Sequence, residues 1–151
     1  LIGIATTTLV AVTLALAPAT ALATSPTITN PGTRNLPNLS TPVQVWLNDT
    51  TPLAGLSGTI KIVASCGAGD PDCTLTISTT TNLSAAVGYS SSDWLTGAPE
   101  LGFVGTRAAV NAALATMTVA LSAAKTTTVT VNATSKLTQP VVEFLTVNVP
   151  L

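Results

Sequence analysis

The sequence LGFVGTRAAVNAALATMTVAL, residues 101–121, decides the fold of this chain. Its alanines favour helix at low entropic cost, and Thr106 before them is suited to cap the first turn, because its hydroxyl can accept a bond from a backbone N–H. The apolar residues recur at i, i+3, i+4 and i+7 and form one stripe about two turns long: Val110, Ala113, Leu114 and Met117. We therefore expect a short helix at about residues 106–115.

Strand-like alternation flanks this helix on both sides. Leu101 and Phe103 precede it, and Val119 and Leu121 follow it, each pair separated by one residue. The helix then carries the chain from one sheet edge to another. Elsewhere, short apolar alternations recur at intervals of about 8–12 residues between turn formers, which is typical of an all-β protein with two packed sheets.

The same stretch resembles a known family. Residues 105–119 resemble the Gly-Thr-x-x-x-Val/Ile-Asn-x-x-Leu-x-x-Leu-x-Tyr element of cadherin-like repeats in large bacterial surface proteins, with Val119-Ala120 where the tyrosine usually stands. Shorter pieces resemble the opening strand, the Asp-x-Asp turn with its next strand, and the closing strand of such repeats: residues 26–31, 69–77 and 144–149. The resemblance spans about 26–149 and implies an immunoglobulin/cadherin-like β-sandwich with a surface role. The acidic linker that binds calcium between cadherin domains is absent, so calcium dependence is not implied.

Composition excludes several classes of function. Of 151 residues, 7% are charged and 46% are hydrophobic, and the net charge is −1. Five Lys and Arg residues are too few for a nucleic-acid footprint. There is no His, which removes the usual general base and most zinc sites. A surface covered by uncharged polar side chains is typical of extracellular proteins that are glycosylated or built into assemblies.

The two cysteines indicate an oxidising compartment. Cys66 and Cys73 bracket a loop rich in turn formers, and we expect a structural disulfide between them. We expect the strand at about 73–78 to pair with the strand at 58–65 as a hairpin across this loop. Unpaired thiols or a partial metal site are the alternatives.

Residues 1–23 are apolar throughout and carry no charge. A secretory signal peptide, cleaved after Ala23, is one interpretation. A retained segment would have to be buried by a membrane or by another subunit, because it exposes more apolar surface than a monomer tolerates. It would serve either as a helix in a membrane or filament core, or as a strand donated to a neighbour. The bulky residues of the strand pattern are the candidate assembly residues: Val10, Val12, Leu14 and Leu16.

No constellation of residues predicts catalysis, so we expect a non-enzymatic protein without a cofactor. Asp70 and Asp72 are weak candidates for calcium ligands, and a solvated turn is the simpler interpretation. Aromatic residues are 3% of the chain, so a carbohydrate-binding face of Trp46, Trp94 and Tyr89 is less usual than core packing of these rings. Sequons for N-glycosylation occur at four positions: Asn38, Asn48, Asn82 and Asn132.

We divide the chain into an apolar segment at 1–23, a linker and edge strand at 24–41, and a β-sandwich domain at 42–151. The function we expect is that of a structural subunit of an extracellular cell-surface assembly, filament-like, pilus-like or adhesive, which polymerises with identical subunits through residues 1–23. Contact with a membrane is expected only transiently or through that segment. The alternative is a secreted monomeric adhesion module that binds carbohydrate or protein through loops near Trp94 once the segment is cleaved.

Overall fold

The computed structural model describes Gly3, residues 27–135 and residues 138–148, and this part of the chain is mostly β. The strands are β1 (Thr27–Ile28), β2 (Thr33–Asn35), β3 (Val43–Gln44), β4 (Leu53–Ala54), β5 (Thr59–Cys66), β6 (Cys73–Thr76), β7 (Ser84–Ala85), β8 (Glu100–Thr106), β9 (Thr118–Leu121), β10 (Thr126–Ser135) and β11 (Thr138–Asn148). The helices are the 3-10 turn η1 (Gly67–Gly69), α1 (Ser92–Thr96) and α2 (Arg107–Ala115).

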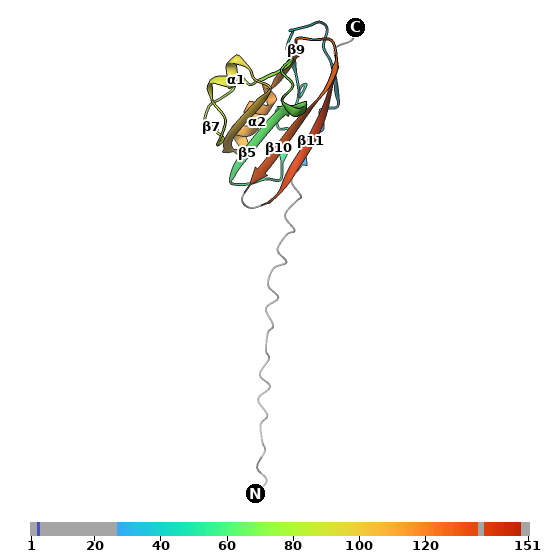
Figure 1. Ribbon diagram of the computed structural model, residues 1–151. Coiled ribbons are helices and arrows are strands. Elements are labelled where there is room, and N and C mark those ends of the chain that lie inside the picture. The colour runs from blue at the N-terminus through green and yellow to red at the C-terminus, as the bar shows by residue number, and fades with distance from the viewer. Residues whose placement is uncertain (1–2, 4–26, 136–137, 149–151) are drawn as a thin grey trace.

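Within the described residues the strands form three sheets. The largest has six strands in the order β2-β11-β10-β5-β8-β7, a second has three in the order β3-β9-β6, and β1 pairs with β4. In Figure 1 the large sheet turns its open face to the viewer, with α2 and β9 behind it. A single buried cluster draws its residues from the large and the three-stranded sheets, among them Ile62, Phe103 and Val119. This arrangement is compatible with a β-sandwich.

The strand β5 lies at the centre of the large sheet, antiparallel to both β10 and β8. Its side chains alternate between the core and the outer face, because successive residues of a strand point to opposite sides. Ile60, Ile62 and Ala64 are fully buried, whereas Lys61 and Val63 face outward. This alternation gives the large sheet one apolar and one mostly polar face.

The predicted helix at 106–115 is confirmed as α2. Ala109 N donates to Thr106 Oγ1 at 3.3 Å, so Thr106 is the N-cap. The predicted apolar stripe is fully buried, at 0% exposure for Val110, Ala113, Leu114 and Met117. Because α2 begins where β8 ends and leads into β9, it carries the chain from the six-stranded sheet to the three-stranded sheet.

Asn111 fastens α2 to the strand β4 from the buried side of the helix. Leu53 N donates to Asn111 Oδ1 at 2.8 Å, and Asn111 Nδ2 donates to Leu53 O at 3.0 Å. The side-chain amide therefore satisfies both polar backbone groups of a buried residue, as a neighbouring strand would. A hydrophobic residue of similar size at this position would leave both groups of Leu53 without partners.

The structure contains a second helix that the sequence did not predict. Ser92–Thr96 form this helix, α1, on which Trp94 is buried at 5% exposure. The indole Nε1 donates to Gly102 O at 3.3 Å, and its ring meets Phe103 edge-on at 6.3 Å between centroids. Five residues are too few to show a helical period, which is why the pattern missed this element.

Two strands at one edge of the large sheet, its first and its last in sequence order, run side by side in the same direction. The strand β2 pairs in parallel with the end of β11, with Thr33 opposite Thr146 and Asn35 opposite Asn148. Arg34 on β2 reaches out of the six-stranded sheet: its Nε donates to Val45 O at 2.9 Å and to Gln44 O at 3.3 Å. Arg34 thus links β2 to β3 of the three-stranded sheet and closes this side of the fold.

We predict that Asn111→Leu lowers the free energy of unfolding by about 2–3 kcal/mol, because it leaves a buried N–H and a buried C=O unpaired. Urea unfolding followed by circular dichroism measures the change. Arg107→Ala, at an exposed position of the same helix, serves as the control and should cost less than about 0.5 kcal/mol. Equal costs for the two variants would contradict a special role for Asn111.

Candidate functional site

The predicted disulfide between Cys66 and Cys73 is present, with an S–S distance of 2.07 Å. Both cysteines are fully buried. The expected hairpin is wrong, however, because β5 belongs to the six-stranded sheet and β6 pairs with β9 in the three-stranded sheet. The bond therefore joins two sheets rather than two neighbouring strands.

The loop between the cysteines turns the chain from one sheet to the other. It begins with η1, where Asp70 N donates to Gly67 O at 3.1 Å, and Cys73 N then donates to Asp70 O at 3.1 Å. Gly69 has a φ of +74°, a left-handed conformation that favours glycine. Beyond these turns β6 pairs with β9 and not with β5, so the loop passes the chain from one sheet to the other.

The two carboxylates of this loop bind a lysine. Lys125 Nζ lies 2.6 Å from Asp70 Oδ1 and 2.7 Å from Asp72 Oδ2. The turn that precedes Lys125 is also fastened to the loop, because Ser122 N donates to Asp72 O at 2.8 Å. The loop of residues 66–73 and the β9–β10 turn thus form one cross-linked end of the domain.

This ion pair shifts the ionisation of its partners. The hydrogen bond from Lys125 lowers the pKa of Asp70 below its ordinary value of 3.8. The hydrogen bonds to Asp70 and then to Asp72 raise the pKa of Lys125 above 10.5. The ammonium lies where a calcium ion bridging Asp70 and Asp72 would lie, and within the described residues no group of three or more acidic, His or Cys side chains is placed to hold a metal.

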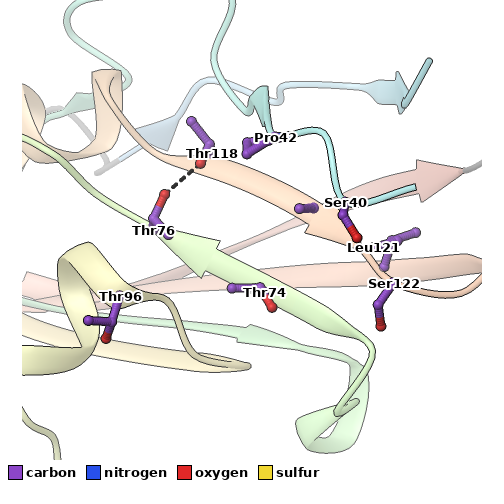
Figure 2. A pocket seen from close by; sticks show the side chains of 9 residues that line it. Ser40, Pro42, Thr74, Thr76, Thr96, Thr118, Leu121 and Ser122 are labelled. Atoms are coloured by element: carbon purple, nitrogen blue, oxygen red, sulfur yellow. Dashed lines mark hydrogen bonds between the residues drawn. The ribbon is translucent and has the colours of Figure 1, made fainter. Parts of the chain in front are cut away.

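A shallow groove crosses the outer face of the three-stranded sheet. It encloses about 260 Å³ and is lined mainly by hydroxyl-bearing side chains from β6, β9, α1 and the loop before β3, with Pro42 at its rim. Figure 2 shows Thr76 and Thr118 pointing toward each other across the two strands, with their Oγ1 atoms 2.6 Å apart. Hydroxyls of this kind both donate and accept hydrogen bonds, so the groove suits an uncharged polar ligand.

A second hollow lies on the outer face of the six-stranded sheet. It encloses about 350 Å³ and is lined by Thr59, Lys61, Val104, Thr134 and Ser135. Lys61 is exposed here and takes part in neither of the two ion pairs found within the described residues.

The tryptophans do not form a carbohydrate-stacking face. Trp46 and Trp94 are buried, at 1% and 5% exposure, and Trp46 Nε1 donates to Thr29 O at 2.7 Å. Tyr89 is half-buried. Near Trp94 the exposed side chains are instead Leu95, at 66%, and Thr96, which lines the hydroxyl groove.

The four sequons differ in their accessibility. Asn38, Asn48 and Asn82 are exposed in loops, and Asn48 and Asn82 both adopt a left-handed φ of 60°. Asn132 is half-buried in the middle of β10, opposite Val63 of β5. A glycan is more easily accommodated at the first three positions than within a central strand.

The candidate assembly residues Val10, Val12, Leu14 and Leu16 lie outside the described residues. No helix among the residues that the structure does describe is long and apolar enough to cross a membrane.

Comparison with known proteins adds no family. No protein-family model matches the chain, and no characterised protein matches its sequence.

We predict that replacing both cysteines, as Cys66→Ala with Cys73→Ala, lowers the free energy of unfolding by roughly 2–3 kcal/mol, since the bond closes a short loop. Urea unfolding of the oxidised protein and of the variant measures the difference. A reducing agent should shift the midpoint of the unmodified chain toward that of the variant and leave the variant unchanged. An unmodified chain insensitive to reductant under unfolding conditions would contradict this.

We predict that Lys125→Met lowers the melting temperature only within a defined pH window. The lowered pKa of Asp70 means that the ion pair stabilises the fold above pH 3.8 and is lost as the pH falls through the lower, folded value. The raised pKa of Lys125 means that the stabilisation is present below pH 10.5 and is lost as the pH rises through the folded value.

Melting curves by circular dichroism across the pH range test this prediction. The modest difference expected of a partly exposed ion pair should be largest between pH 3.8 and 10.5 and should shrink outside these limits. Arg107→Met, which removes an exposed cation that takes part in neither of the two ion pairs found among the described residues, serves as the control. A pH-independent loss for Lys125→Met would show that its contribution comes from packing.

Proposed function

We propose that this chain is a non-enzymatic structural subunit of an extracellular cell-surface assembly, filament-like, pilus-like or adhesive, and that it polymerises through residues 1–23. The buried disulfide carries the proposal. It joins two sheets covalently, and such bonds persist in oxidising compartments outside the cytosol. The surface agrees with this placement, because polar coverage comes mostly from hydroxyl groups and 7% of the residues are charged.

The strand order supports an immunoglobulin-like sandwich within this proposal. In such folds strands C, F and G form one sheet and strands A, B, E and D the other. Here β11, β10 and β5 are neighbours in the order G-F-C, and β3, β9 and β6 in the order B-E-D. A departure is β8, which follows β6 in sequence, extends the large sheet beyond β5 and passes to β9 through α2.

The sequence of residues 1–23 supplies the proposed means of assembly. It presents Val10, Val12, Leu14 and Leu16 at alternate positions, a pattern suited to a strand donated to another subunit. The same residues would be lost if the segment were removed by a signal peptidase. The exposed sequons at Asn38, Asn48 and Asn82 are where glycans of a surface subunit would be carried.

The alternative is a secreted monomer that binds an uncharged ligand such as a neutral carbohydrate. One observation favours it, namely the hydroxyl-lined groove that reaches Thr96 beside Trp94. The two functions differ in the fate of residues 1–23, so one experiment separates them.

We predict that the native protein retains residues 1–23, that it sediments as a polymer, and that Leu14→Asp lowers the polymer fraction at least about tenfold, because a buried carboxylate costs several kcal/mol. Intact mass and analytical sedimentation of the protein purified from a secreting host provide the measurements. Ala15→Asp, on the opposite side of the strand pattern, is the matched control and should polymerise. A mature N-terminus at Thr24 together with a monomeric mass would replace this proposal with the alternative.

A further inference from the structure

The outer face of β8, β5 and β10 carries its side chains in rows that the strand register defines. One row contains Val104, Lys61 and Thr134, and the next contains Gly102, Val63 and Asn132. A third row contains Glu100, Ser65 and Thr130. We call these three rows the docking face. In Figure 1 the short green turn η1 lies in front of β10, beside Thr127 and Thr128, and the rows of the docking face follow farther along that strand.

Two opposite charges flank the central row. Lys61 lies in the row on one side of Val63, and Glu100 lies in the row on the other side, on the adjacent strand. On β5 the two outer rows are marked by Lys61 and Ser65, which are four residues or about 13 Å apart along the strand. The side chains of Lys61 and Glu100 are therefore too far apart to form a salt bridge within one chain. Both residues are exposed, and the two ion pairs found within the described residues involve Lys125 instead.

The central row is partly apolar. Gly102 has no side chain, and the ring of Tyr89 fills the space above it, since a Cβ at Gly102 would lie 2.3 Å from Tyr89 Cδ2. Val63 lies opposite Gly102 on β5. An aromatic and aliphatic centre with polar rows on either side is the usual anatomy of a protein interface.

We propose that a second copy of this chain binds the docking face about a two-fold axis that runs along the central row. Such an axis exchanges the two outer rows, so that Glu100 of each copy lies over the row of Lys61 in the other. It also places Val63 against Val63 and Tyr89 against Tyr89, as an isologous interface requires. The charges that cannot meet within one chain then pair twice between two chains.

The hollow on this face fits the same arrangement. It adjoins Lys61 and is lined by Thr59, Val104 and Thr134, so it leaves room beside the Lys61 ammonium for a side chain from the partner's row. This inference rests on the proposed function, in which identical subunits associate. It specifies one surface for that association, separate from residues 1–23. It also requires that Asn132, in the central row, carries no glycan.

Zero-length cross-linking tests the interface directly. A carbodiimide joins an amine to a carboxylate without a spacer, so a Lys61–Glu100 amide can form only between chains. The full chain is kept in mild detergent to suppress association through residues 1–23, and the products are digested and analysed by mass spectrometry. We expect a dimer whose cross-linked peptides contain Lys61 and Glu100.

Charge reversal supplies the quantitative test. Lys61→Glu and Glu100→Lys should each weaken dimerisation about tenfold in sedimentation velocity, because each replaces two attractions with two repulsions. The double variant should restore the original dimer, and Arg107→Glu on α2 should leave it unchanged. A monomer in detergent, a dimer without the Lys61–Glu100 link, a double variant as weak as the single ones, or a glycan found on Asn132 would each overturn the docking face.

The outcomes distinguish this inference from the proposed function. If the docking face fails while the chain still polymerises after detergent removal, the proposed function stands without it. If the native chain lacks residues 1–23 and does not polymerise but still dimerises through Lys61 and Glu100, the docking face stands and assembly through residues 1–23 does not.

Discussion

The amide of Asn111 is the interaction on which the arrangement of the sheets depends. The helix α2 is the covalent route from the large sheet to the three-stranded sheet, and its apolar stripe alone would let it slide or rotate on the core. By bonding both backbone groups of Leu53, Asn111 fixes one rotation and one height of the helix relative to β4. Directional bonds of this kind select one packing among several that bury similar apolar area.

The few charges of the chain are used in the same local way. Arg34 bonds the carbonyl groups of Gln44 and Val45 and holds β2 to the other sheet, and Lys125 holds the β9–β10 turn to the loop that leaves β5. In each case a long cationic side chain joins two different segments of the chain, only 10–11 positions apart for Arg34 but more than fifty for Lys125. Among the exposed polar residues that the structure describes, most are Ser or Thr, and the two ion pairs found there share one lysine, so this part of the fold does not depend on a network of ion pairs.

Local patterns in the sequence predicted local features well. The helix at 106–115, its Thr106 cap, its buried stripe and the disulfide all follow from residue spacing over fewer than about fifteen positions, and the structure confirms them.

The predictions that failed concern pairing between segments. The strand after Cys73 was expected beside β5, but it pairs with β9 in the other sheet, and nothing in its own alternation distinguishes the two partners. The contacts of Lys125 with Asp70 and Asp72 were missed for a related reason, since they join residues more than fifty positions apart. The short helix α1 likewise depends on the contacts of Trp94 with β8 rather than on a local period, whereas the core packing of Trp94 itself was expected and is confirmed.

The parallel pairing of β2 with β11 has a mechanical consequence. These strands lie near the two ends of the described chain, and they point in the same direction. Tension applied to the two ends therefore shears their hydrogen bonds together instead of opening them one at a time, and a load that must break several bonds at once is resisted better than one that peels them in turn. Residues 67–72 lie inside the Cys66–Cys73 bridge, so stretching the chain cannot extend them while the bond is intact. A domain with these two features is suited to bear force along its length.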